Sequence, residues 1–174
     1  MLQFLEKYTV AQKGVGTYFI VFGVVFFFST MVIRIIFGRS LIFTGLNWGS
    51  FSSALILTAS GIIYRAYCDH IHRKAAATLF ENETEYVKTE YSRMEKVAKD
   101  FRRYQIVFSA LAFVTLIIAV FIHSKMVKGV FFAATILFVG MLAIEYYSRN
   151  SIKDYTQQLG EAMRKALKKY AWEV

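Results

Sequence analysis

The sequence predicts an all-α membrane protein with about four transmembrane helices, a cytoplasmic helical hairpin and a C-terminal amphipathic helix. The first observation is four apolar stretches, because a helix needs about 20 mostly apolar residues to cross the hydrocarbon core of a bilayer. They are residues 15–33, 48–64, 106–122 and 129–144. The second is composition, since 56% of the 174 residues are hydrophobic and none is proline, which favours long unbroken helices. The third is charge, which lies mainly between and beyond the stretches.

Lys and Arg are distributed unevenly around the four stretches. Of the 21, seventeen lie in the N-terminal arm, in the insert 65–103 or after Glu145. The remaining four are Arg34, Arg39, Lys125 and Lys128. Because basic residues favour the cytoplasmic side, we expect both termini and the insert to be cytoplasmic in a bacterial inner membrane. The four external cations have no acid beside them, so around a ring they would favour anions at an outer mouth.

The chain is expected to form a single unit that begins with an interfacial helix. Residues 1–13 place Leu2, Leu5 and Tyr8 on one helical face, which is typical of a helix lying on a membrane surface. Residues 15–64 should then form transmembrane helices one and two, joined by a turn over residues 38–47.

The second stretch is the most polar of the four. Gly45, Gly49 and Ser53 recur at every fourth position, and small residues at this spacing let helix backbones approach closely in lipid. Two interpretations stay open: packing within the chain, or contact between subunits or with a water-filled lumen. The candidate pore or helix-contact residues are Gly49, Ser53, Thr58 and Ser60.

Residues 65–104 should continue the second helix into the cytoplasm and return as another. Asn82 followed by Glu85 is typical of a helix N-cap, so we expect a turn near residues 81–83. The resulting hairpin would extend roughly 25 Å at 1.5 Å per residue. Seven acids beside nine bases predict a mixed-charge helical surface rather than a phosphate-binding stripe.

Residues 105–147 should form transmembrane helices three and four. The last stretch has only 16 uncharged residues, so it spans the membrane only if Glu145 or Lys128 lies at an interface. Residues 148–174 should form a cytoplasmic amphipathic helix packed on the hairpin, with Tyr170 and Trp172 exposed near its end.

Few residues suggest a catalytic, metal-binding or phosphate-binding site. The single Cys68 excludes a disulfide within the chain and a cysteine-rich metal site. The sequence has neither a glycine-rich phosphate loop nor a nucleophile elbow. We therefore expect no catalytic residue, metal or cofactor, no DNA partner and no enzymatic activity.

One pattern resembles a nuclease motif. Arg65 and His70, with His72 two residues further on, match the Arg-x4–6-His spacing of HEPN ribonucleases. That chemistry uses a His as general acid or base and an Arg that stabilises the charged phosphorane. Here Ala66 replaces the usual polar residue after the Arg, and a membrane-boundary Arg is also explained by contact with phosphate headgroups. We interpret the three residues as a vestigial motif lining a cytoplasmic vestibule.

With this motif, its length and its Phe-rich helical layout, the chain resembles the small Csx-type membrane accessory proteins of type VI-B CRISPR systems. The resemblance implies a distant HEPN relative that forms an oligomeric inner-membrane pore. It also implies a role in antiviral defence, in which the pore depolarises the cell after an RNA-guided RNase has acted. That RNase, or its RNA products, would then be a partner.

The residues alone favour a homo-oligomeric membrane pore or membrane-perturbing effector. One chain of four helices encloses no wide water-filled path, so a pore requires a ring of subunits. The first alternative is a non-pore anchor or adaptor in the lipid bilayer that recruits a soluble partner through its cytoplasmic helices. The second is a membrane-tethered HEPN-like ribonuclease.

Overall fold

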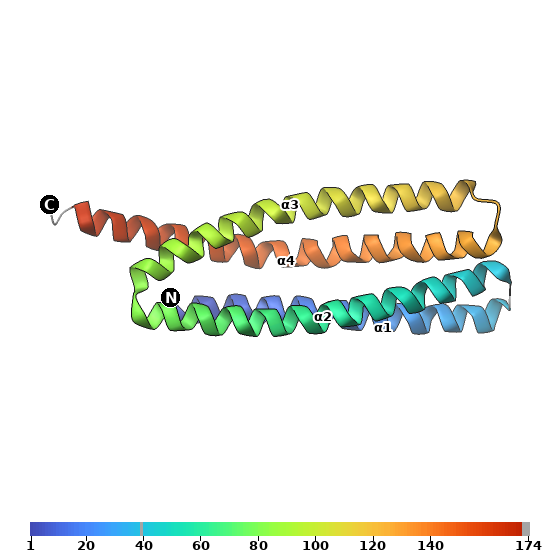
Figure 1. Ribbon diagram of the computed structural model, residues 1–174, viewed down its shortest axis with the longest axis horizontal. Helices are drawn as coiled ribbons and strands as arrows, with labels where there is room; N and C mark the ends of the chain where they lie inside the picture. Colours follow the sequence, from blue (N-terminus) through green and yellow to red (C-terminus); the bar gives the residue numbers. More distant parts are fainter. Residues whose placement is uncertain (39, 172–174) are drawn as a thin grey trace.

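The fold is a long bundle of four antiparallel helices. The computed structural model describes the backbone of residues 1–38 and 40–171, and the side chains among these as far as residue 165. The helices are α1 (Leu2–Phe37), α2 (Leu41–Glu81), α3 (Glu83–Phe121) and α4 (Lys125–Ala171). The N-terminus, the α2–α3 turn and the end of α4 lie at one end of the bundle, and the other two turns lie at the opposite end (Figure 1).

All four helices are long and apolar enough to cross a membrane. This confirms the prediction of an all-α protein with four candidate transmembrane helices. Each helix is longer than the apolar stretch within it, so we divide the bundle into two parts. The apolar part comprises residues 15–64 and 105–147, and the charged end comprises residues 2–13, 65–104 and 148–165.

Large apolar side chains cover the outside of the apolar part. Val25, Phe28, Ile63 and Phe113 are all more than half exposed. Such a surface is costly in water but matches the hydrocarbon of a bilayer. The surface therefore agrees with the lengths of the helices in indicating a membrane protein.

The α2–α3 turn agrees with the sequence. Asn82 has an extended backbone between the two helices, and its side chain accepts hydrogen bonds from the backbone N–H groups of Thr84 and Glu85, both at 3.1 Å. The predicted N-cap is confirmed. It satisfies two of the donors that the start of a helix leaves without a partner.

Three predicted boundaries differ from the structure. Residues 1–13 form no separate helix, because α1 is continuous from Leu2 and Leu5 is buried against α3 and α4. Likewise α4 continues through residue 148, where we expected a new helix. The turn predicted over residues 38–47 is shorter, because Gly38 reverses the chain with a φ of 83° and the Ser40 side chain caps α2.

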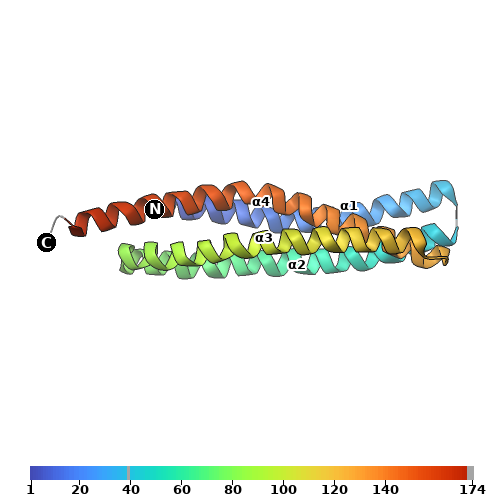
Figure 2. The same cartoon turned by 90° about the horizontal axis from the view of Figure 1, so that it is seen from above.

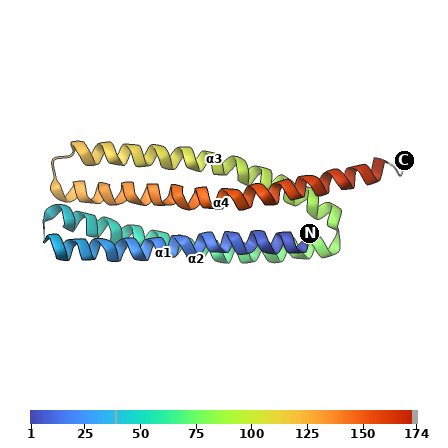
Figure 3. The ribbon, with the colours of Figure 1, turned by 180° about the vertical axis from the view of Figure 1, so that it is seen from behind.

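The four helices pack as two hairpins joined along α2 and α4. Contacts are most extensive between α1 and α2, α3 and α4, and α2 and α4, so the last pair forms the central seam. Figures 2 and 3 show the α1–α2 hairpin running alongside the α3–α4 hairpin for most of its length.

Glycine permits the closest approach at this seam. A Cβ atom on Gly45 would overlap the backbone of Met126, and one on Gly129 would overlap the backbone of Ile42. Without a hydrophobic effect between helices in lipid, such close backbone packing is a main source of their association.

The main cluster of buried apolar side chains lies in the charged end. Its members are Leu5, Ala75, Tyr86, Val87, Met94, Ile152, Tyr155 and Leu159. They come from all four helices, so this end packs like the core of a water-soluble helical bundle.

Candidate functional site

The small residues of α2 mostly pack inside the chain. Gly49 lies against Val130 and Ala133 of α4, and Ser53 is buried. Thr58 is half-buried, whereas Ser60 is exposed. The geometry of the first two supports the interpretation of packing within the chain, and Ser60 alone of the four faces outward.

Hydroxyl groups in the apolar part also bond within the chain. Thr30 of α1 lies 2.6 Å from the Ser50 hydroxyl of α2 and donates to Asn47 Oδ1 at 3.2 Å. Thr115 of α3 and Thr135 of α4 bond to each other at 3.0 Å. These contacts join helices and leave these hydroxyls turned away from the surface.

Arg65, His70 and His72 do not form one site within the chain. Arg65 donates to Thr17 Oγ1 of α1 at 3.0 Å, and His72 Nδ1 lies 3.1 Å from Thr9 Oγ1. His70 is exposed on another face of α2. Among the described residues, no group of three His, Cys, Asp or Glu could hold a metal ion.

Three of the four predicted outer cations lie at the end of the bundle opposite the charged end. Arg34 and Lys128 are half-buried and Lys125 is exposed. Arg39 lies outside the described residues, as does Trp172, and the side chain of Tyr170 is not described.

Glu145 lies inside the bundle, and its depth in a membrane stays a prediction. Its side chain is buried, and Oε2 has no hydrogen-bond partner among the described residues. A buried carboxylate oxygen without a partner costs free energy.

Gln12 forms a hydrogen-bonded junction between three helices that the sequence pattern did not predict. The Gln12 side chain of α1 is only 2% exposed. Its Oε1 accepts a 2.5 Å hydrogen bond from the Tyr64 hydroxyl of α2, and its Nε2 donates to Ser148 at 3.2 Å and Ser151 at 3.0 Å on α4. One amide therefore joins three helices where the apolar part meets the charged end.

A second buried polar cluster lies further into the charged end. Tyr8 of α1 stacks on Tyr155 of α4 with ring centroids 4.4 Å apart. The Tyr155 hydroxyl lies 2.6 Å from that of Tyr86 and donates to Glu90 Oε1 at 3.2 Å. Arg93 donates two hydrogen bonds to the Glu90 carboxylate, at 2.8 and 2.6 Å. We call these five residues the tyrosine cluster.

Burial alters the acidity of the cluster. It raises the pKa of Tyr8 to about 12 and that of Tyr86 to about 12. It also raises the pKa of Tyr155, which the charge of Glu90 raises further. Although burial opposes it, pairing with Glu90 raises the pKa of Arg93. The tyrosines therefore stay neutral and the arginine charged near neutral pH.

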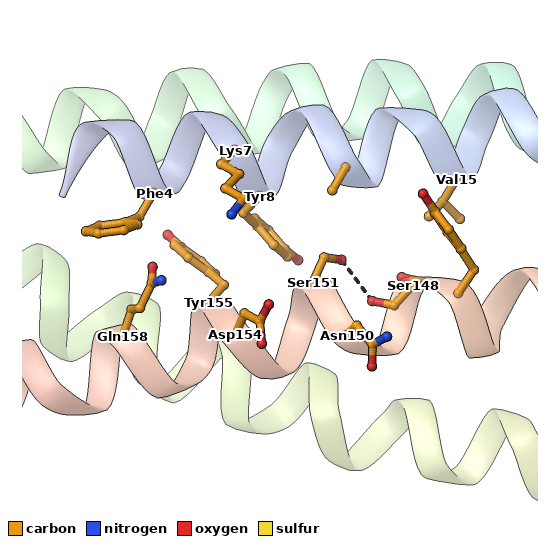
Figure 4. Close-up of a pocket in the computed structure, with 12 residues that line it drawn as sticks. Phe4, Lys7, Tyr8, Val15, Ser148, Asn150, Ser151, Asp154, Tyr155 and Gln158 are labelled. Carbon is orange, nitrogen blue, oxygen red and sulfur yellow. Dashed lines mark hydrogen bonds between the residues drawn. The ribbon is translucent and has the colours of Figure 1, made fainter.

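A groove of about 290 Å³ lies between α1 and α4 beside this cluster (Figure 4). One basic and one acidic side chain, Lys7 and Asp154, line it together with Tyr8 and Tyr155. A smaller cavity of about 140 Å³ lies between α1, α2 and α3, and Cys68 and Arg93 are among the residues that line it. Burial raises the pKa of the Cys68 thiol, which disfavours the reactive thiolate.

Comparisons with known proteins find no family model, curated protein or solved structure that matches the chain. The resemblance to the type VI-B accessory proteins therefore stays a hypothesis.

Proposed function

We propose that the protein is a membrane anchor whose rigid charged end presents a binding surface at the cytoplasmic face. The observation that supports this most is the packing of the charged end, with a buried core and the tyrosine cluster shared among the helices. Rigid, well-packed helices are suited to present a fixed surface to a soluble partner.

The cytoplasmic orientation rests on charge. The charged end contains most of the Lys and Arg of the chain. Basic residues are retained on the cytoplasmic side of membranes during insertion, so both termini and the α2–α3 turn belong there.

The second proposal is the homo-oligomeric pore, which includes the depolarising effector implied by the type VI-B resemblance. Ser60, exposed on α2, and Lys125, exposed at the opposite end, could line a path between subunits in a ring. Against it, Thr30, Ser50 and Ser53 are buried inside the chain, so they are not available to line a lumen without repacking.

The size of the purified protein in mild detergent, measured together with potassium leakage from liposomes, distinguishes the two proposals. A small particle that never leaks supports the anchor, and a large ring that leaks supports the pore. The exposed Ser60 provides the discriminating variant: Ser60→Leu should leave an anchor unchanged but reduce the size and leakage of a ring. Ser53→Leu is the matched control, since it disturbs packing inside the chain in either case.

A further inference from the structure

A large groove between α3 and α4 is lined by cations. It has a volume of about 770 Å³, within the range of small-ligand sites. The basic residues on its walls are Arg102, Arg149, Lys153 and Arg164. No Asp or Glu is among its described lining residues, unlike the smaller groove between α1 and α4.

Three acids of the charged end pair with cations outside the groove. Asp69 pairs with Lys13, Glu90 with Arg93, and Asp100 with Arg103. None of the four groove cations lies within 4 Å of a carboxylate in the described part of the chain. Gln157, which lines the groove, donates a hydrogen bond to Glu161 Oε1 at 3.2 Å. Positive charges along one groove disfavour one another where they are close, and a bound anion would offset that repulsion.

The lining and position of the groove indicate what kind of anion it would bind. Ile152, Ala98 and Phe101 contribute apolar lining, and Gln105 and Thr156 add polar groups. Arg102 and Arg149 lie within four residues of the apolar part, at the depth where phosphate headgroups would lie.

We propose that this groove binds a phosphate-bearing ligand with an apolar moiety, its phosphate held by Arg102 and Arg149 next to the apolar part and its apolar moiety against the apolar side chains that line the groove. Arginine binds phosphate through paired, charge-assisted hydrogen bonds. Two sources have this chemistry: the headgroup of an anionic phospholipid and a soluble phosphate compound such as a nucleotide. The location at the edge of the apolar part favours the headgroup. The proposal holds for a monomeric anchor and for a ring.

The experiment uses the full-length protein in mild neutral detergent. In one arm, native mass spectrometry counts bound phosphatidylglycerol or cardiolipin against phosphatidylcholine. In the other, calorimetry measures binding of ATP and of sodium pyrophosphate. We expect retention of anionic lipid and weak or no binding of the soluble phosphates. Binding in the second arm alone would instead assign the groove to a soluble phosphate ligand.

Matched variants locate the binding. Arg149→Gln with Lys153→Gln removes two groove cations, and we expect about tenfold weaker binding or more. Arg73→Gln with Lys96→Gln removes the same charges from exposed positions outside the groove and should leave binding unchanged.

Arg102→Gln with Arg164→Gln repeats the test if the first pair lowers the yield of folded protein. The proposal is overturned if no probe binds in either arm, or if the groove and control variants lose binding equally.

Discussion

At the scale of single residues, the charged end contains a buried carboxylate, that of Glu90, which is stable only while it is paired. Glu90 is 5% exposed and accepts hydrogen bonds from both Arg93 and Tyr155. A buried carboxylate is tolerated because these donors replace the water that it lost on folding. The stability of the folded state therefore depends on the donors that Arg93 and Tyr155 provide to Glu90.

Glu90→Gln tests this pairing. It leaves the half-buried guanidinium of Arg93 without a counter-charge, and we expect a loss of about 2 kcal/mol in the free energy of unfolding. Thermal and denaturant unfolding in mild detergent measure it. Asp100→Asn is the control, because Asp100 also pairs with an Arg three residues later on α3 but is more exposed, and should cost about 1 kcal/mol or less. Equal losses in the two variants would contradict the role of burial.

Alkaline pH tests the tyrosines of the same cluster. Burial raises the pKa of Tyr8 and of Tyr86 to about 12, whereas an unfolded tyrosine titrates near pH 10. Stability is unaffected by these groups below pH 10. Above it, the unfolded state loses protons that the folded state keeps, so the free energy of unfolding falls by up to about 1.4 kcal/mol per pH unit for each tyrosine until about pH 12.

Tyr8→Phe should therefore make stability less steeply dependent on pH between about 10 and 12, as measured by unfolding at a series of pH values. Tyr146→Phe, at an exposed position, is the control and should keep the wild-type slope. A slope that Tyr8→Phe leaves unchanged would show that Tyr8 is accessible to solvent.

At the scale of elements, small residues set the closest approach of the helices in the apolar part. Gly45 and Gly129 bring α2 and α4 together at the central seam, and Gly16 and Gly61 do the same for α1 and α2. Most large residues of the apolar part remain on the outside, where a bilayer would cover them.

Gly45→Ala tests the seam. Its Cβ would meet the backbone carbonyl of Met126, which cannot move without shifting α4, and we expect a loss of about 1 to 3 kcal/mol. Gly14→Ala is the control, since nothing lies within 4 Å of the added Cβ and removing a helical glycine should stabilise by about 0.5 to 1 kcal/mol. Unfolding temperatures in mild detergent should shift in opposite directions, and a shared direction would argue against the close contact.

For the whole molecule, the arrangement separates charge from apolar surface along the bundle axis. The N-terminus, the α2–α3 turn and the end of α4 share one end, and the turns at residues 38–40 and 122–124 share the other (Figure 1). If the bundle spans a membrane, the N-terminus, Asn82 and the end of α4 therefore lie on the same side.

Reporter fusions test this orientation. Because of the charge bias, a reporter after Val174 or at Asn82 should read cytoplasmic, and one after Gly38 or at Ser124 should read external. An external reading at Asn82 with a cytoplasmic one after Gly38 would invert the proposed topology, and readings on opposite sides for Asn82 and Val174 would contradict the bundle itself.

The sequence by itself determined the class of protein, the number of long helices and the α2–α3 turn. These depend on local properties: an apolar stretch long enough for a bilayer, and an Asn side chain that caps the helix beginning next to it. The extent of α1 and α4 was not predicted, because residues 1–13 and 148–165 have the same amphipathic pattern whether they lie on a membrane or pack against other helices.

Only the tertiary structure decided which charges and polar groups meet. The insert alone is a mixture of acids and bases, but Asp69, Glu90 and Asp100 pair with cations away from the α3–α4 groove. That groove combines Arg102 from the insert with Arg149 from the tail, which are far apart in the sequence. The junction at Gln12 likewise joins three helices. Helical periodicity shows which residues share a face, but the partner of each face follows from how the helices pack.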